Sequence, residues 1–151
     1  MKFKLIMYII SFPEESWVEK NEPHRYEDVV AIDQGLKTFD NKEVVSFNQK
    51  ITVGEDQIDV LRTYNPEITE NAGNNSSSVY KMNVQGTKIL FLGDLGVEGG
   101  EELLSLNKEA IKNMDYVQMA HHGQAGVNED VYQVIDPKYC LWPTTDWLWK
   151  K

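Results

Sequence analysis

Apolar and polar positions follow one another in short stretches over the first 92 residues, which is typical of strands in a partly buried sheet. Residues 2–10 are rich in Ile, Leu, Phe and Tyr, and Gln85-Gly86-Thr87 is typical of a hairpin turn before the continuous apolar strand at 88–92. The other strands expected in this part lie at 44–47, 51–53, 57–64 and 77–84. This part of the chain is therefore expected to be rich in strands.

Three helices are expected. After Pro23, the positions of Tyr26, Val29, Val30, Leu36 and Phe39 approximate one apolar face of a helix. Two further helices are expected at 98–113, with a break near Asn107, and at 128–135, after the capping residue Asn128. They alternate with strands at 116–120 and 139–142. The order of elements predicts an α+β, mixed αβ fold, in which helices cover at least one face of a mixed β-sheet.

Composition limits the functions that this chain can have. Its 151 residues are enough for one core, so we interpret 1–151 as a single domain that is incomplete. A net charge of −9 argues against direct binding to nucleic acid or to an anionic membrane. The apolar run at 5–10 is too short for a membrane span and is interpreted as a buried strand. The single cysteine, Cys140, fits a reducing compartment, and we expect a cytoplasmic protein.

Polar residues that can bind metal follow two of the apolar strands. Asp94 comes directly after the strand at 88–92, and His121 and His122 come directly after the strand at 116–120. Carboxylate oxygen together with imidazole nitrogen suits zinc, manganese or iron. Taken alone, an Asp after Gly is more often a turn or cap residue, and paired histidines in a loop are more often surface residues. Their joint occurrence on successive strand-helix units favours a metal site.

Five sequence pieces in this order and spacing resemble a known family. They are N-N-S-S at 74–77, I-L-F-L-G-D at 89–94, E-L-L at 102–104, D-Y-V-Q-M-A-H-H-G at 115–123 and I-D-P-K at 135–138. The stretch 74–149 resembles the second half of a metallo-β-lactamase-fold hydrolase. It is most similar to the branch found in the soluble domain of DNA-uptake competence channel proteins. The first 70 residues resemble this family only loosely.

The resemblance implies a fold, a reaction and site residues. The fold would be part of a four-layer αββα sandwich, and the cofactor would be zinc, with manganese or iron as alternatives. Asp94 would bridge two metal ions, and His121 or His122 would be a late ligand, so that Asp94 and His122 are the candidate catalytic residues. In the intact family a metal-bound hydroxide attacks an ester, phosphodiester or lactam. Asn75 and Ser76 would lie near this edge as substrate-binding residues, unless they form a plain Asx turn.

One departure from the family pattern is large. The main metal motif, His-x-His-x-Asp-His, is absent from 1–73, and His24 alone, which we expect to be solvated, cannot replace it. Asp94, His121 and His122 would make at most a weak site for one ion. Either an N-terminal half is missing, or the fold has lost its catalysis.

The alternative to a hydrolase is a non-catalytic module that associates with itself or with a partner. In the family fold the elements present here pack against a first half, so part of the sheet is expected to lack cover at Ile89, Phe91, Val117 and Met119. The C-terminal segment adds Trp142, Trp147 and Trp149. Exposed apolar surface of this kind marks interfaces, and a homodimer is the expected form. For the metal-site hypothesis, Asp94 and the histidine pair must lie at neighbouring strand ends.

Overall fold

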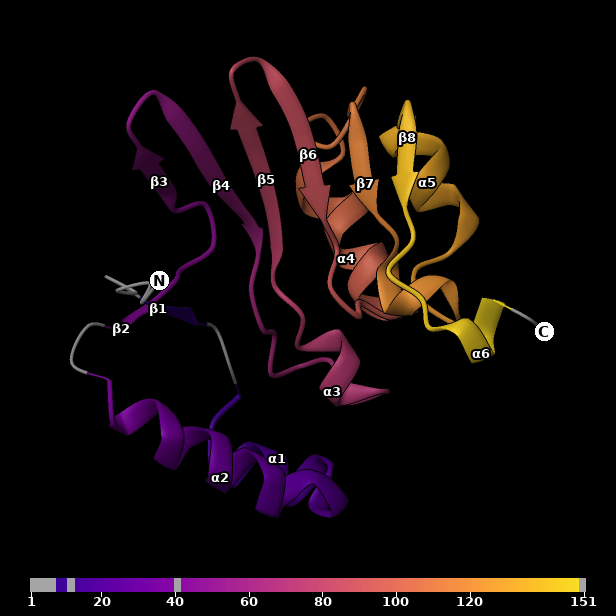
Figure 1. Ribbon diagram of the computed structural model, residues 1–151. Coiled ribbons are helices and arrows are strands. Elements are labelled where there is room, and N and C mark those ends of the chain that lie inside the picture. Colours follow the sequence, from indigo (N-terminus) through magenta and orange to yellow (C-terminus); the bar gives the residue numbers. More distant parts are fainter. Residues whose placement is uncertain (1–7, 11–12, 40–41, 150–151) are drawn as a thin grey trace.

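A mixed sheet of six strands forms the centre of the computed structural model, which describes residues 8–10, 13–39 and 42–149 (Figure 1). The strands lie in chain order: β3 (Lys50–Val53), β4 (Asp56–Arg62), β5 (Val79–Val84), β6 (Thr87–Phe91), β7 (Tyr116–Gln118) and β8 (Tyr139–Leu141). β3 to β6 pair antiparallel, whereas β6, β7 and β8 pair parallel. Tight turns join β3 to β4 and β5 to β6, and the longer segment 63–78 joins β4 to β5. The parallel neighbours are joined by crossovers through helices. The predicted mixed αβ fold with a mixed sheet is confirmed.

Two helices cover one face of this sheet. α4 (Val97–Asn107) connects β6 to β7, and α5 (Glu129–Ile135) connects β7 to β8. α4 ends at Asn107, where the sequence predicted a break. Leu103 of α4 and Ile135 of α5 are fully buried in one cluster with Leu90 and Val117 of the sheet. The hydrophobic core therefore lies between these helices and the strands, and we call this the covered face.

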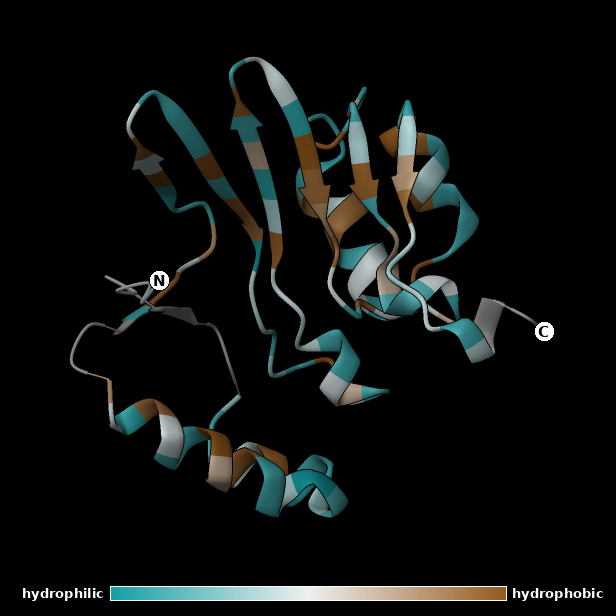
Figure 2. Ribbon diagram, viewed as in Figure 1, coloured by the Kyte–Doolittle hydropathy of each residue, from teal (hydrophilic) through white to brown (hydrophobic). Residues whose placement is uncertain are grey.

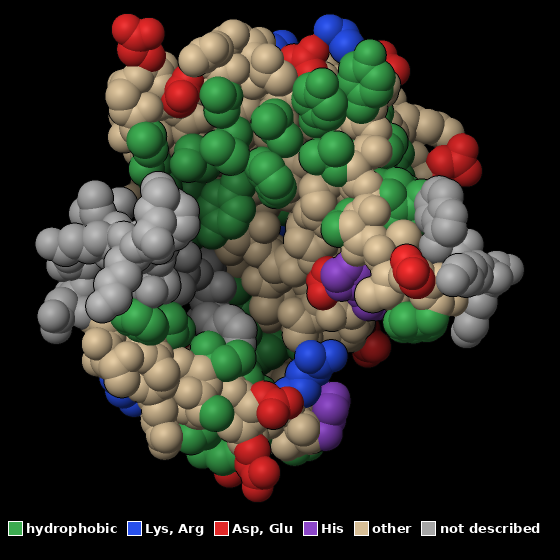
Figure 3. Space-filling model, viewed as in Figure 1, with side chains coloured by type: hydrophobic (Ala, Val, Ile, Leu, Met, Phe, Trp, Pro, Cys, Tyr) green, Lys and Arg blue, Asp and Glu red, His purple; other side chains and the backbone are tan. Residues whose placement is uncertain are grey.

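The opposite face of the sheet carries apolar side chains, and no helix of the described residues forms a layer over them. Directly paired residues of neighbouring strands point to the same side, and the register joins Ile89 to Tyr116 and Tyr116 to Tyr139. The tyrosine rings of this row stack with centroids 5.2 Å apart, and Tyr139 is 61% exposed. Figure 3 shows hydrophobic side chains gathered over the strands on this side. We call the surface made by Tyr80, Met82, Ile89, Phe91, Tyr116, Tyr139 and Leu141 the open face.

The structure contradicts the expected lack of cover for one of the four residues, Ile89, Phe91, Val117 and Met119. Ile89 and Phe91 are only partly buried on the open face, as expected. Val117 is fully buried, because it pairs with Leu90 and faces the helices. Met119 is partly buried after the end of β7. The prediction that Val117 lacks cover was therefore wrong. The exposed Trp142 and Trp147 agree with the expectation, and the side chain of Trp149 lies outside the described residues.

The N-terminal elements form a separate layer. β1 (Tyr8–Ile10) pairs parallel with β2 (Lys42–Val44), and the helices α1 (Glu15–Asn21), η1 (Pro23–Arg25) and α2 (Tyr26–Lys37) lie together at the lower left of Figure 1. α2 was predicted, α1 was not, and residues 2–7 of the predicted first strand lie outside the described residues. Figure 2 shows hydrophobic positions on these helices as well as along the strands.

Three short elements complete the described chain: α3 (Ala72–Asn75) between β4 and β5, η2 (Ala120–Gly123) after β7, and α6 (Asp146–Trp149) near the C-terminus. None of the helices in the described residues combines the length and the apolar character that crossing a membrane requires.

Candidate metal centre

The parallel strands β6 and β7 bring Asp94 and the histidine pair to one edge of the sheet. Phe91, near the end of β6, pairs with Gln118, the last residue of β7. Asp94 Oδ1 lies 3.6 Å from His122 Nε2, and the two side chains are 45% and 48% exposed. The prediction that these groups lie at neighbouring strand ends is confirmed. Their distance is long for a hydrogen bond and suits two atoms that face a common ligand.

The histidine turn has an uncommon backbone. His121, His122 and Gly123 follow one another with φ angles of 48°, 58° and 76°, which is left-handed geometry. Residues with a Cβ adopt this region at a cost, and such residues are frequent at functional sites. Gly123 cannot carry a side chain here, because a Cβ would lie 2.2 Å from Trp142 Nε1. The turn is therefore held by its contacts with the segment after β8.

That segment also orients the imidazole of His122. His122 Nδ1 lies 2.7 Å from the carbonyl oxygen of Pro143, and Trp142 Nε1 donates to the carbonyl oxygen of His122 at 2.6 Å. A carbonyl oxygen only accepts, so the hydrogen of this ring is assigned to Nδ1. In the neutral ring, Nε2 then has a lone pair directed towards Asp94. This is the tautomer that a metal ligand binding through Nε2 requires.

Gln118 fixes the two strand ends against each other. Its Oε1 accepts hydrogen bonds from the backbone N–H groups of Leu92 at 3.0 Å and Gly93 at 2.8 Å. Its Nε2 donates to the carbonyl oxygens of Gly93 and Met119. The backbone N–H of His121 also donates to Gly93 O, at 3.0 Å. Sequence reasoning missed Gln118, although a polar residue inside the apolar run 116–120 was a signal that could have identified it.

The structure distinguishes between the two histidines. His122 faces Asp94, whereas His121 Nδ1 lies 3.3 Å from the carbonyl oxygen of Ala125, and the ring centroids are 6.3 Å apart. His24 is exposed on η1, as expected. Within the described residues, no three or more His, Cys, Asp or Glu side chains group closely enough to hold a metal ion. Asp94 and His122 thus fit part of a tetrahedral site and not a whole one, and their role as ligands stays a prediction.

Asn75 has a structural role at the start of α4. It is only 2% exposed, and its Oδ1 accepts hydrogen bonds from the N–H groups of Gly96 at 3.1 Å and Gly99 at 3.0 Å. Its Nδ2 donates to Glu70 O and to Glu98 Oε2, both at 2.8 Å. These four bonds use the full capacity of the amide, so it can bind a substrate only by giving up one of them. Substrate binding by Asn75 stays a prediction.

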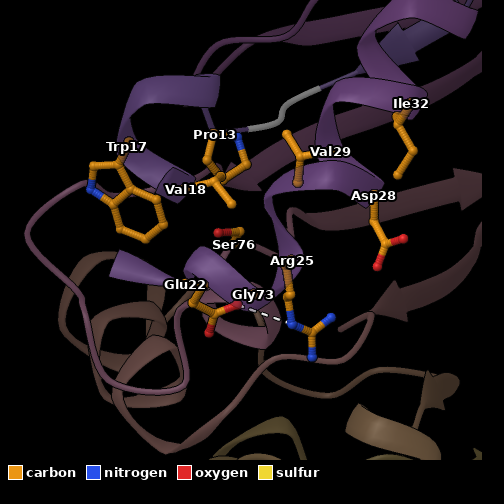
Figure 4. Close-up of a pocket in the computed structure, with 10 residues that line it drawn as sticks. All are labelled: Pro13, Trp17, Val18, Glu22, Arg25, Asp28, Val29, Ile32, Gly73 and Ser76. Carbon is orange, nitrogen blue, oxygen red and sulfur yellow. Dashed lines mark ion pairs between the residues drawn. The ribbon is translucent and has the colours of Figure 1, made fainter. Parts of the chain in front are cut away.

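Ser76 borders a small cavity between α1, α2 and α3. Its hydroxyl donates to Ala72 O at 2.7 Å, and the cavity has a volume of about 200 Å³. Figure 4 shows the ion pair of Arg25 with Glu22, 3.0 Å long, on the side of Gly73. The residues that line the cavity are Pro13, Trp17, Val18, Glu22, Arg25, Asp28, Val29, Ile32, Gly73 and Ser76. The Ser76 hydroxyl is already hydrogen-bonded, and its predicted role in substrate binding stays a prediction.

No family model and no curated protein sequence matches the chain. Among solved structures, one similar chain is a putative Zn-dependent hydrolase of the metallo-β-lactamase superfamily from Thermotoga maritima, with 18% identity and a TM-score of 0.41 over 71% of this chain and 52% of that one. Another is the metallo-β-lactamase fold protein YhfI from Bacillus subtilis, with 13% identity and a TM-score of 0.45 over 94% of this chain and 68% of that one.

A third similar structure is a protein of unknown function from Enterococcus faecalis V583, with 18% identity and a TM-score of 0.39 over 55% of this chain and 18% of that one. The chain spans about half the length of the Thermotoga protein and less than a fifth of the Enterococcus protein. At these identities and scores, membership of the metallo-β-lactamase superfamily is a proposal.

Proposed function

We propose that this chain is part of a metallo-β-lactamase-fold hydrolase domain and that Asp94 and His122 are two ligands of a divalent metal ion. The observation that supports this proposal is their meeting at neighbouring parallel strand ends, 3.6 Å apart. The Nδ1 contact of His122 with Pro143 adds to it, because this contact leaves Nε2 available for a metal ion. Zinc is the proposed ion, with manganese or iron as alternatives, since all three accept carboxylate and imidazole ligands.

In this proposal the chain supplies only part of the catalytic centre. The reaction class is hydrolysis of an ester or phosphodiester, in which the metal ion would polarise the substrate and stabilise developing charge. The described residues bring no third protein ligand to Asp94 and His122, so efficient hydrolysis needs ligands from another segment or another chain. The five sequence pieces listed above favour the competence-channel branch, and Cys140, which is exposed and free, fits the cytoplasm.

Zinc titration of the purified chain by calorimetry tests the metal site. We expect the unaltered chain to bind zinc weakly and Asp94→Ala to lose at least about tenfold in affinity. Removing a residue that only hydrogen-bonds to a metal ligand already lowers metal affinity by about 10–100-fold, and Asp94 is a proposed ligand itself. His24→Ala is the matched control, since His24 is an exposed histidine on η1, and its affinity should be unchanged. Absence of zinc binding, or equal binding by Asp94→Ala, would contradict the proposal.

A second measurement tests whether the centre is incomplete. With zinc or manganese added, the chain should hydrolyse a generic phosphodiester such as bis-p-nitrophenyl phosphate no faster than Asp94→Ala does. Metal-dependent turnover that Asp94→Ala abolishes would show that the chain holds a complete centre.

A second candidate function is self-association through the open face. Tyr139 is 61% and Leu141 is 44% exposed, both on β8, which is the edge strand of the sheet. An exposed apolar surface beside an edge strand favours association with another chain, because association buries the apolar side chains and pairs the free backbone groups of the strand. A second copy of the chain, placed by two-fold symmetry, would cover both. The net charge of −9 opposes non-specific aggregation and favours a defined dimer.

Sedimentation velocity over a range of concentrations tests this second candidate. We expect a dimer that dissociates on dilution and that Leu141→Lys shifts towards monomer by at least about tenfold in Kd. Leu106→Lys is the control, because Leu106 is similarly exposed, at 51%, but belongs to α4 on the other side of the sheet. A monomer at all concentrations would exclude self-association.

A further inference from the structure

A depression with several lysines lies on the covered side of the sheet, away from the candidate metal centre. It has a volume of about 410 Å³ and is lined by Lys50, Gln57, Asp59, Lys81, Asn83, Lys88, Glu109, Ala110, Lys112 and Met114. Lys88 lies near the start of β6, whereas Asp94 follows the end of the same strand. We call this depression the lysine pocket. None of its residues belongs to the proposed metal centre.

The register of the sheet explains why these side chains converge. Lys50, Asp59 and Lys81 are direct neighbours on β3, β4 and β5, and their row continues to Leu90 on the covered face. The next row joins Asn83 to Lys88 and to Gln57. The floor of the lysine pocket is therefore made by two adjacent cross-strand rows. The segment after α4 supplies the remaining wall, with Glu109, Ala110, Lys112 and Met114.

The lysine pocket is positive although the whole chain is negative. It contains four lysines against two acids, in a chain with a net charge of −9. Asp59 lies 3.0 Å from Lys81 and 3.9 Å from Lys50, so one carboxylate is shared by two ammonium groups. Lys88 makes no ion pair among the described residues. Asp115 is nearby and accepts a hydrogen bond from the backbone N–H of Lys88 at 2.8 Å, but its carboxylate pairs with Lys138 at 2.7 Å.

Two details indicate that an anion can enter. The Lys81 side chain is only 21% exposed, so water screens its charge less than at an open surface. Glu109, which pairs with Lys112 at 2.5 Å, is 81% exposed and can turn away into solvent. An incoming anion could then take the place of its carboxylate beside Lys112. The excess positive charge would be balanced without a change in the backbone.

We propose that the lysine pocket binds the phosphate group of a small phosphorylated molecule. Ammonium groups bind phosphate as point charges, and several of them around one depression give the charge that a di- or triphosphate requires. A volume of about 410 Å³ lies within the usual range of small-molecule sites. A nucleic acid backbone is disfavoured, because its many phosphates would also meet the surrounding negative charge of the protein. This proposal does not rest on the proposed metal centre.

Calorimetric titration of the full chain at low salt, without metal, tests the proposal with three probes. Pyrophosphate and ATP should bind, whereas adenosine should not, because adenosine lacks the phosphates. Lys88→Gln should weaken pyrophosphate binding by about three- to tenfold and leave thermal unfolding unchanged, since Lys88 is exposed. Lys37→Gln is the matched control, because Lys37 is an exposed lysine on α2 that pairs with Asp33, and its affinity should equal that of the unaltered chain.

Several results would overturn the proposal. They are absence of pyrophosphate binding at millimolar concentration, equal affinity in Lys88→Gln, binding of adenosine as strong as that of ATP, and binding of duplex DNA in preference to pyrophosphate. Asp94→Ala should bind pyrophosphate like the unaltered chain. This last titration separates failure of the lysine pocket from failure of the metal centre.

Discussion

The two faces of the central sheet are made by the same strands but differ in what covers them. On the covered face, Leu90 and Val117 are fully buried beneath α4 and α5. On the open face, their sequence neighbours Ile89 and Tyr116 are only partly buried, and Tyr139 is mostly exposed. Because consecutive strand residues alternate between faces, the difference in cover arises between adjacent residues of one strand.

Chain connectivity explains the difference. The parallel strands β6, β7 and β8 are joined by the crossover helices α4 and α5, and successive crossovers of the same hand place their helices on one side of a sheet. The antiparallel strands β3 to β6 contribute hairpins and loops, and α3 as the one helix between them, so they place no comparable layer on the other side. The open face is therefore a consequence of topology. Its apolar side chains can be buried only by a segment outside the described residues or by another chain.

The largest expected loss of stability comes from truncating Leu90 on the covered face. Leu90→Ala removes a fully buried side chain and should lower the free energy of unfolding by about 3–5 kcal/mol, because the cavity cannot collapse between sheet and helices. The matched change Ile89→Ala, on the open face, should cost about 1 kcal/mol. Urea unfolding followed by circular dichroism measures both. Equal losses at the two positions would show that the open face is as well covered as the other.

A smaller loss is expected from the ion pair beneath α4. Arg62 is 1% exposed, and its Nε donates to Glu102 Oε2 at 2.7 Å, while its Nη1 donates to Ser77 O at 2.8 Å. Burial lowers the pKa of Arg62, and Glu102 opposes this shift. Glu102→Gln leaves the buried guanidinium without its counter-charge and should cost about 2–4 kcal/mol. The exposed neighbour on α4 supplies the control, since Glu101→Gln should change stability by less than about 0.5 kcal/mol.

Much of the fold could be predicted, because its strongest elements have local signals. The run 89–92 is continuously apolar, and Asn107 interrupts the helical pattern where α4 ends. The pairing of Asp94 with a histidine could be predicted for the same reason, since parallel strand ends meet at one edge of a sheet. Each of these features has a local signal, because the metal-binding side chain directly follows its apolar strand.

Other features depend on contacts between distant residues and could not be predicted. The burial of Val117 depends on which residue of β6 it pairs with, and a shift of register by one residue reverses it. Three polar residues have structural roles that depend on partners far away in sequence. The pairs are Gln118 with Gly93, Asn75 with Gly96, and Arg62 with Glu102. α1 has too few apolar positions in its seven residues to stand out by periodicity.

The pH dependence of stability tests whether α1 shields Tyr64, which follows β4, from water. Its ring meets Trp17 edge-on, and burial, together with the charges of Glu14 and Glu67, raises its pKa to about 12. The neutral form is therefore favoured in the folded state. This contribution is fully present below pH 10, the usual pKa of an unfolded tyrosine, and is lost as pH rises through about 12.

Between pH 10 and 12, the unaltered chain should lose about 1–2 kcal/mol more stability than Tyr64→Phe, which has no titrating hydroxyl. This value is below the full free energy of the pKa shift, because solvent screens a partly exposed side chain. Urea unfolding curves for both chains at pH 9, 10, 11 and 12 provide the comparison. Parallel pH profiles would mean that α1 does not shield Tyr64 in solution.

The smallest expected effect lies on the open face, at Tyr139. Tyr139→Ser removes the ring stacked on Tyr116 and should cost about 0.5–1 kcal/mol in dilute solution, whereas Tyr139→Phe keeps the stack and should cost little. If a second copy covers this face, the cost of Tyr139→Ser must grow with protein concentration, because association stabilises only the chain that can associate. Unfolding measured at micromolar and at hundredfold higher concentration distinguishes the two cases. A cost that stays constant would mean that no second copy covers Tyr139, and the open face would then be free for a different partner.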